Sequence, residues 1–235
     1  MCTVSFVFAA DKIIITSNRD EQVARPAIEP RNYLVNNKNL FFPKDPKAGG
    51  TWYAVDDHAN VLVLLNGAEE KQSWNPPYRR SRGLIVLDLL SSESAIDSWE
   101  TIHLNNIEPF TMVLFQDHEL YQLRWNGTQK NKRQLNIHEN HIWSSSTLYA
   151  KEVREQRAQW FFNFLDATPA VTFEEMFRFH RYTEPDDAQH GLVINRNEKL
   201  KTLSITQSVI EQNKITVMHH DLIAEEEFSN TFIHV

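Results

Sequence analysis

Apolar and polar residues alternate from Cys2 to Phe8, a pattern typical of a β-strand with one strongly apolar face. Ala10 and Asp11 then suit a short turn, and the apolar segment 12–18 predicts the partner strand of a hairpin. Apolar runs separated by turn residues predict the remaining strands in the same way. These strands are expected at 51–55, 60–66, 110–117, 119–125, 141–148, 191–196, 201–210 and 214–223.

Apolar residues spaced three and four apart predict four helices, which fall into two pairs. The first pair covers 81–92 and 94–104, and the second covers 150–167 and 172–182. Thr172 is the expected N-cap of the last helix, because its hydroxyl can accept a hydrogen bond from the first turn. The order of strands, two helices, strands, two helices and strands predicts an α+β fold. We expect a four-layer αββα sandwich with largely antiparallel sheets.

Length, charge and cysteine content narrow the class of protein. The 235 residues favour a single domain over 1–235. The net charge of -7 argues against binding to a phosphate backbone, so we expect no nucleic-acid partner. No apolar run approaches the ~18 residues that would span a bilayer. The single cysteine permits no internal disulfide, which suits a reducing compartment, and we therefore expect a cytoplasmic protein.

The position of that cysteine, directly behind the initiator methionine, suggests catalysis as well as packing. If Met1 is removed, Cys2 gains an α-amine of reference pKa roughly 7.7–8.0, which can act as general base for its own thiol. The hairpin would bring Cys2 near Arg19, which could stabilise a thiolate, and near Asp20, which could bind the amine. Neighbours on a strand face opposite sides, so both residues reach Cys2 only if the strand bends there. The alternative is that Cys2 packs as a small hydrophobe.

Short motifs, in order along most of the chain, resemble those of the NRDE family, which includes relatives of transport-and-Golgi-organisation protein 2. The resemblance begins with MCTVSF at 1–6 and IITSNRDE at 14–21. It continues with RP at 25–26, FPKDPKAGGTW at 42–52, LLNGA at 64–68, SRG at 81–83 and LSITQ at 203–207. On these motifs the chain is identified as a member of the family.

The NRDE family is in turn similar to N-terminal nucleophile hydrolases such as penicillin V acylases and bile-salt hydrolases. This resemblance implies the αββα sandwich and an amide hydrolysis in which Cys2 is the nucleophile and Asp20 binds its amine. The acylases carry their arginine three residues before the aspartate, where this chain has Ser17. Arg19, directly before Asp20, is the arginine of this chain that would take the corresponding role.

A second group of candidates lies around the LLNGA motif. Amide cleavage creates a tetrahedral oxyanion, to which the Asn66 side chain and a nearby backbone N–H could donate. The alternative is a plain Asn-Gly turn. The acylases use a second asparagine from a later strand, and Ser146 stands in its place here. The candidate substrate-binding residues are therefore Asn18, Gly50, Gly67 and Ser146.

We expect neither a metal nor a cofactor. The chain has ten histidines but no HExxH motif, and His219 and His220 face opposite sides of a predicted strand. The leading hypothesis is an N-terminal cysteine hydrolase whose partner is a small-molecule amide or acyl ligand. The rival, suggested by eukaryotic members of the family, is a non-catalytic binding or trafficking protein for haem, acyl-CoA or lipid. The sequence leaves open whether the protein forms a homo-oligomer.

Overall fold

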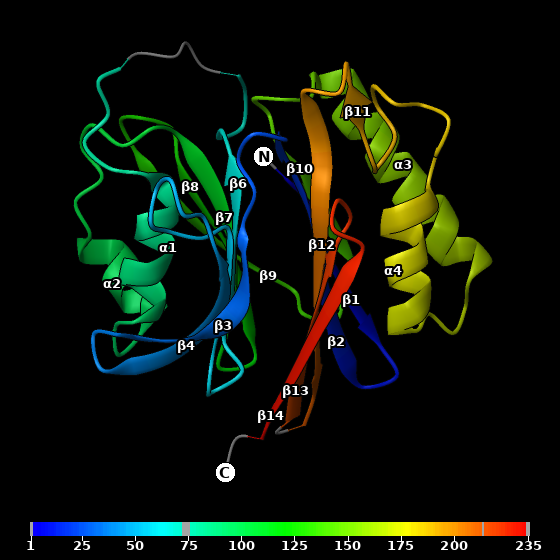
Figure 1. Ribbon diagram of the computed structural model, residues 1–235. Helices are drawn as coiled ribbons and strands as arrows, with labels where there is room; N and C mark the ends of the chain where they lie inside the picture. The colour runs from blue at the N-terminus through cyan, green and yellow to red at the C-terminus, as the bar shows by residue number, and fades with distance from the viewer. Residues whose placement is uncertain (1, 72–75, 213, 234–235) are drawn as a thin grey trace. The chain divides into compact units, whose positions relative to one another are not determined.

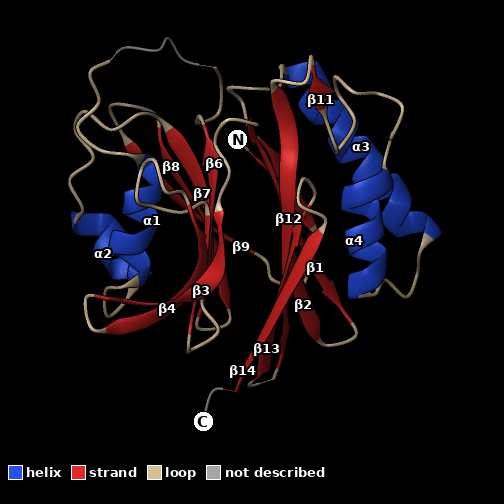
Figure 2. Cartoon of the chain, viewed as in Figure 1, coloured by secondary structure: helices blue, strands red, loops and turns tan. Residues whose placement is uncertain are grey.

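The structure is a computed structural model that describes residues 2–71, 76–212 and 214–233, with the backbone alone at Cys2 (Figure 1). The chain forms two compact units, which are described separately. Unit 1 comprises Met1–Pro26 and His138–Ile233, and unit 2 comprises Ala27–Ile137. Each unit contains an antiparallel sheet and a pair of helices (Figure 2). A single domain over residues 1–235 stays a prediction.

Unit 1 is built on a seven-stranded sheet in the order β10-β1-β2-β12-β13-β14, with β11 paired to β12. Every paired strand is antiparallel to its neighbour. The bounds are β1 Cys2–Ala9, β2 Lys12–Gln22, β10 His141–Ser144, β11 Asn195–Arg196, β12 Leu200–Glu211, β13 Lys214–Asp221 and β14 Glu226–Ile233. β2 and β12 are the central pair, and both are buried along most of their length.

The β1–β2 hairpin forms as the alternating pattern predicts. Ala9 and Lys12 are register partners, so two residues make the turn. Ala10 and Asp11 have φ values of 50° and 59°, the left-handed conformation that a tight two-residue hairpin turn requires. This turn fixes the register of the whole ladder, which determines what lies opposite Cys2.

The helices of unit 1 are α3, Lys151–Ala167, and α4, Phe173–Tyr182, which pack on one face of this sheet. Thr172 caps α4 as predicted, and its capping box with Glu175 is complete. An apolar cluster joins the sheet to the helices. Its buried members are Val7, Ile14, Phe161, Val171, Met176, Phe179 and Leu192.

Unit 2 contains a seven-stranded sheet in the sequential order β3-β4-β5-β6-β7-β8-β9, again antiparallel throughout. Its strands are β3 Ile28–Val35, β4 Lys38–Lys44, β5 Tyr53–Asp56, β6 Val61–Asn66, β7 Phe110–Gln116, β8 Glu119–Trp125 and β9 Lys130–Leu135. The helices are α1, Arg82–Leu90, and α2, Ala95–Thr101, and they contact β5, β6 and β7. Ser81 and Ser94 are their N-caps.

The four predicted helices and most predicted strands are confirmed, although the strand expected at 141–148 ends at Ser144 and gives way to a turn. The strand expected at 191–196 is wrong for its first four residues, because only Asn195–Arg196 pairs with β12. Leu192 and Ile194 are buried there without being part of a strand, and their apolar character caused the error. Within the described residues, no helix is both long and apolar enough to cross a membrane.

Candidate functional site

The register of the β1–β2 ladder positions the candidate residues at the start of the chain. Cys2 pairs with Arg19, and Thr3 pairs with Asn18. β2 runs to Gln22 without a break, so Arg19 and Asp20 keep opposite faces of the strand, and the irregularity beside them lies in the ladder with β12, between Thr202 and Ser204. Asp20 therefore lies one residue past the last pair of the ladder, beside the end of β1 that carries the Cys2 backbone nitrogen. The Cys2 side chain lies outside the described structure.

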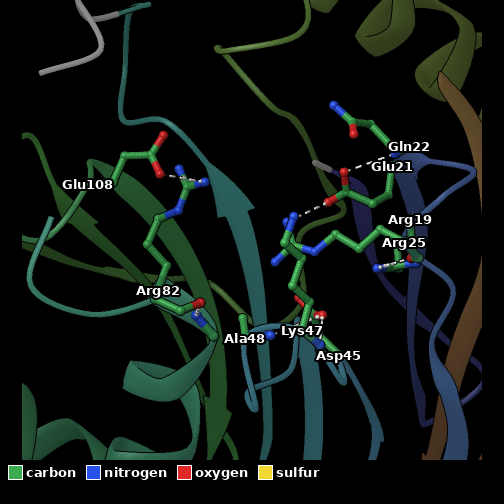
Figure 3. Close-up of polar contacts among 11 residues, drawn as sticks. Arg19, Glu21, Gln22, Arg25, Asp45, Lys47, Ala48, Arg82 and Glu108 are labelled. Carbon is green, nitrogen blue, oxygen red and sulfur yellow. Dashed lines mark hydrogen bonds and ion pairs between the residues drawn. The ribbon is translucent and has the colours of Figure 1, made fainter. Parts of the chain in front are cut away.

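Arg19 is a buried arginine on the face of β2 opposite to the helices. Its side chain is 3% exposed, and Nη2 donates to the backbone oxygen of Arg25 at 3.0 Å (Figure 3). Arg25 in turn forms an ion pair with Glu21 at 3.4 Å. Burial lowers the pKa of His219 to about 4, and the positive charge of Arg19 acts in the same direction. Arg19 is thus a buried positive charge on this face of the sheet.

Asp20 faces the helices and is completely buried. The Tyr149 hydroxyl donates to Oδ2 at 2.6 Å, and the Thr202 hydroxyl donates to Oδ1 at 2.6 Å. Thr202 is the register partner of Asp20 on β12, directly before an irregularity in the ladder between Thr202 and Ser204. Each carboxylate oxygen therefore has its own hydroxyl donor.

The Asp20 carboxyl has a raised pKa, and burial is the largest cause. Burial raises the pKa of Asp20, whereas the positive charge of Arg157 and the hydrogen bonds from Thr202 and Tyr149 lower it. Burial and the charge of Asp20 raise the pKa of Tyr149 well above its ordinary value, so the phenol keeps its proton and donates it to the carboxylate. The two hydroxyl donors and the cation of Arg157 thus act against the rise that burial causes in the pKa of Asp20.

Arg157 on α3 is the buried cation of this cluster. Its guanidinium lies 3.6 Å from the centre of the Tyr149 ring. Nη1 donates to the Thr3 hydroxyl at 2.5 Å, while Nη2 and Nε donate to the backbone oxygens of Gly191 and His190 at 2.5 and 3.1 Å. Arg157 thus connects the residue next to Cys2 with the aromatic donor of Asp20.

Asn18 was predicted to bind substrate, but its polar atoms are used to hold α4 against β2. Nδ2 donates to the backbone oxygens of His180 and Leu192 at 3.0 and 2.7 Å. Oδ1 accepts from His180 Nδ1 at 2.5 Å, and Nε2 of the same ring accepts from the Ser5 hydroxyl at 2.7 Å. Burial, reinforced by the charge of Arg157, lowers the pKa of His180 to about 3, so the imidazole is neutral.

Ser146 lies buried in the turn that follows β10, where the backbone oxygen of Ser145 accepts from the N–H of Leu148 and of Tyr149. The turn leads into α3 and carries Tyr149, the donor to Asp20. Ser146 and the Asp20 cluster thus belong to the same part of unit 1.

Asn66 and Gly67 lie in unit 2, at the end of β6. Gly67 has a φ of 84°, and its N–H donates to the backbone oxygen of Pro109 at 3.0 Å. The Thr111 hydroxyl donates to the Gly67 oxygen at 3.0 Å. The backbone N–H and oxygen of Gly67 are thus both hydrogen-bonded within unit 2. Of the two predicted oxyanion donors at this motif, the Asn66 side chain is therefore the one to test by substitution.

Gly50 has a structural reason to be glycine. A Cβ at this position would lie 2.3 Å from the Gly83 carbonyl carbon and 2.6 Å from the Leu84 nitrogen. The loop before β5 therefore approaches the first turn of α1 backbone to backbone. The nearby basic segment is also paired, since Arg80 contacts Asp88 at 2.7 Å and Arg82 contacts Glu108 at 3.0 Å (Figure 3).

The partners of Asp20 were missed by the sequence analysis. Tyr149 and Thr202 lie 129 and 182 positions from Asp20 along the chain, and no local motif connects them. Arg157 sits in a helix whose other charged residues are exposed or half-buried. Among the described residues, no three His, Cys, Asp or Glu side chains group as metal ligands would.

Solved structures with similar folds include two hydrolases. The N-acylethanolamine-hydrolyzing acid amidase ortholog of Caenorhabditis elegans matches with a TM-score of 0.61 and 13% identity, over 88% of this chain and 92% of that chain. A variant of conjugated bile acid hydrolase from Clostridium perfringens matches with a TM-score of 0.55 and 9% identity, over 97% and 92% of the two chains. These likenesses define the fold as the α+β type of the N-terminal nucleophile hydrolases, as predicted.

A family model described as Transport and Golgi organisation 2 matches residues 1–225, and the chain belongs to this family. The transport and Golgi organization 2 homolog of Mus musculus is 30% identical over 103 residues. That alignment spans 40% of this chain and only 36% of the mouse protein. The resemblance inferred from the motifs is thereby confirmed.

Proposed function

We propose that this protein is an N-terminal cysteine hydrolase that cleaves a small amide of the N-acyl class. The proposal rests on the residues that lie together at the open end of the β1–β2 hairpin. There Arg19 is the register partner of Cys2, and Asp20 follows with a buried carboxylate. The terminal amine, the thiol, a cation and an anion would thus share one end of the hairpin once Met1 is removed.

In the proposed reaction the α-amine of Cys2 takes the proton of its own thiol, giving a thiolate and an ammonium. The Asp20 carboxylate stabilises the ammonium, and the thiolate sulfur attacks the amide carbonyl carbon. The ammonium returns a proton to the leaving nitrogen as the C–N bond breaks, which leaves an acyl thioester on Cys2. Water, deprotonated by the amine, then attacks the thioester and releases the carboxylic acid and the thiol.

The position of the arginine is compatible with this role despite its departure from the acylase spacing. Residues 17 and 19 are two apart on β2, so they lie on the same face of the strand. The shift therefore moves the cation by about 6.7 Å along one face and does not transfer it to the other. Arg19 remains on the face that its register partner Cys2 shares, and we propose that it lowers the pKa of the thiol.

Asn66 and Ser146 remain the oxyanion donors that we propose on the family resemblance. A serine hydroxyl offers one proton where an asparagine amide offers two. The names of the similar structures agree with the reaction class, since one is an N-acylethanolamine-hydrolyzing amidase and the other a conjugated bile acid hydrolase. Identities of 13% and 9% support the fold alone, so the substrate class is our proposal.

The test begins with intact-mass measurement, which reports whether Met1 is absent from natively produced protein. Mature protein is then incubated with N-acylethanolamines and with acyl-glycine amides of increasing acyl length, and release of the free acid is measured. We expect turnover with at least one probe, and a transient acyl adduct on the sole cysteine by mass spectrometry. Cys2→Ala should lower kcat by about 10⁴-fold or more, and Asn66→Ala by about 10²–10³-fold.

Lys151→Ala serves as the control variant, because its side chain is 66% exposed on α3. It should retain wild-type turnover. A Cys2→Ala protein that hydrolyses the probes at the wild-type rate would exclude the proposal. Hydrolysis of the probes by protein that still carries Met1 would also exclude the proposal.

The second candidate, a carrier for haem, acyl-CoA or lipid, is favoured by one observation. The Gly67 N–H already donates to Pro109, so fewer donors remain for an oxyanion than the acylase pattern suggests. Saturable binding of haem or acyl-CoA, monitored by absorbance or by calorimetry, without hydrolysis of any probe would support the carrier. Equal binding by Cys2→Ala would then show that the thiol is not a ligand.

A further inference from the structure

We propose that Tyr149, Thr202 and Arg157 form a positioning unit that fixes the Asp20 carboxylate in its ionised form beside the start of β1. This inference rests on the proposed function, because it assigns the residues through which Asp20 would hold the terminal ammonium. None of the three needs to touch the substrate. They are positioning residues that act through Asp20.

The first step of the argument is the geometry of the carboxylate. Two hydroxyls at 2.6 Å occupy one lone pair on each oxygen of Asp20, and they come from separate elements. Tyr149 precedes α3, while Thr202 lies on β12. Thr202 is itself held, because its hydroxyl oxygen accepts from the Ile194 N–H at 2.9 Å. The carboxylate plane is therefore fixed from two sides, and each oxygen keeps capacity for a further donor.

The second step concerns charge. A buried carboxylate without a cation would take up a proton, and a protonated Asp20 could not stabilise an ammonium. Arg157 supplies that cation through the ring of Tyr149, over which its guanidinium stacks at 3.6 Å. Arg157 is completely buried and its three nitrogens donate to fixed oxygens, so the cation cannot move away to solvent.

The third step is connection to the nucleophile. Arg157 Nη1 donates to the hydroxyl of Thr3, the residue that follows Cys2. The same side chain thus anchors the start of β1 and balances the charge of Asp20. Among the described residues, the cluster is also approached by Arg196, whose guanidinium lies 5.3 Å from the Tyr149 ring, and by His180, which is neutral.

The positioning unit predicts a measurable property of the sole thiol. With Asp20 ionised, the terminal ammonium is stabilised, and a neighbouring ammonium lowers the pKa of the Cys2 thiol. If a donor to Asp20 is removed, the ammonium loses part of its counter-charge and the thiol pKa should rise. Because the chain contains one cysteine, alkylation reports on this group alone.

The experiment measures the rate of alkylation by iodoacetamide against pH, using mature protein whose mass shows that Met1 is absent. The variants are Tyr149→Phe and Thr202→Val, which remove one hydroxyl each with little change in volume. Thr202→Ser restores the hydroxyl, and Arg157→Lys keeps the charge. Tyr182→Phe is the matched control, since Tyr182 is 59% exposed. Thermal unfolding of each variant establishes that it is folded.

We expect Tyr149→Phe and Thr202→Val to move the midpoint of the alkylation profile upward by about 1 pH unit. One hydrogen bond to a carboxylate favours its charged form over its protonated form by roughly tenfold, and that preference is lost in each variant. Thr202→Ser and Tyr182→Phe should keep the wild-type midpoint, and Arg157→Lys should shift less than Tyr149→Phe. Where turnover is measurable, Tyr149→Phe and Thr202→Val should each lower kcat about tenfold and leave KM unchanged. A merely structural role would not move the midpoint.

The outcomes separate this inference from the proposed function. If Asp20→Asn shifts the midpoint while folded Tyr149→Phe and Thr202→Val do not, the positioning unit is overturned and the role of Asp20 stands. If Asp20→Asn leaves the midpoint unchanged, both the positioning unit and the proposed role of Asp20 are overturned. If the predicted shifts occur in a protein that hydrolyses no probe, the positioning unit is supported and the proposed reaction is not.

Discussion

The two units bury different kinds of residue where their helices meet their sheets. In unit 2 the buried residues of α1 and α2 are apolar or glycine, namely Gly83, Ile85, Val86, Leu87, Leu89, Leu90, Ala95 and Trp99. In unit 1 the buried residues of α3 and α4 include Arg157 and His180. Asp20 lies beneath them on β2. The helices of unit 2 thus bury no charged side chain, whereas those of unit 1 bury an arginine and a histidine above a buried carboxylate.

This difference indicates where folding stability alone does not account for the residues present. Burying a charge is costly, and a well-packed apolar substitute is often as stable or more stable. In unit 2 the buried residues of α1 and α2 include no charged side chain. The retention of Arg157 and Asp20 in unit 1, at the end of β2 that adjoins Cys2, is therefore consistent with a functional role.

The largest expected effect contrasts one residue from each interface. Arg157→Met removes the cation and leaves the buried Asp20 carboxylate uncompensated, which should lower the free energy of unfolding by about 3–5 kcal/mol at pH 7. Leu89→Ala removes a fully buried apolar side chain on α1 and should cost about 2–5 kcal/mol. Chemical denaturation measures both.

The pH dependence separates the two variants. Without Arg157 the folded-state pKa of Asp20 rises further above its unfolded value, so stability is lost as pH rises through that interval. The cost of Arg157→Met should therefore be smaller near pH 4 than at pH 7, whereas the cost of Leu89→Ala should be the same at both. Equal costs of Arg157→Met at the two values would contradict a charge-compensating role.

A second effect, expressed per pH unit, distinguishes the two faces of the unit 1 sheet through their buried histidines. The pKa values of His180 and His219 are lowered to about 3 and about 4, from an unfolded value near 6.5. Unfolded chains bind these protons first, so stability should fall as pH decreases below about 6.5, by about 1.4 kcal/mol per pH unit for each histidine. Measurements of unfolding free energy from pH 7 to pH 4 would follow this slope.

Single substitutions resolve the contribution of each ring. His180→Gln or His219→Gln should each remove about half of the slope between pH 6.5 and pH 4. His180→Gln should also lower stability at pH 7, because Asn18 and Ser5 lose the partner that joins them to α4. An unchanged slope in both variants would mean that neither ring is held neutral by burial.

The sequence predicted those elements whose local pattern agrees with their burial. The β1–β2 hairpin follows from alternation and a two-residue turn, and the capping box at Thr172 and Glu175 marks the start of α4. The strands that were not predicted are β3, β4, β9 and β14, and all of these except β4 are edge strands of their sheets. An edge strand such as β9, with mostly exposed polar residues, has little apolar periodicity to detect.

The candidate site could be predicted only in part for a related reason. Local pairing along one hairpin identifies Arg19 and Asp20 as neighbours of Cys2, because their register depends on a turn of two residues. The donors to Asp20 arrive from β12 and from the turn before α3, and only the folded topology brings them there. Arg157 was missed because a charged residue in an amphipathic helix is usually exposed.

The smallest expected effect concerns the helix starts, where the two units use similar chemistry. The Thr172 hydroxyl accepts from the Glu175 N–H at 3.3 Å on α4, and the Ser94 hydroxyl accepts from the Asp97 N–H at 3.3 Å on α2. Thr172→Ala and Ser94→Ala should each cost about 1 kcal/mol, because an N–H of the first turn loses its acceptor. Thermal unfolding would detect a loss of this size.

Ser94→Ala should be the more costly of the two, because its hydroxyl also accepts from the Gln116 side chain at 3.2 Å. In Thr172→Ala the other half of the capping box can persist, since Glu175 accepts from the Thr172 backbone N–H at 2.9 Å. Thr172→Ser and Ser94→Thr keep the acceptor and should stay within a few tenths of a kcal/mol of the wild type. If the two alanine variants follow this order, the second hydrogen bond to the Ser94 hydroxyl accounts for the difference between the two caps.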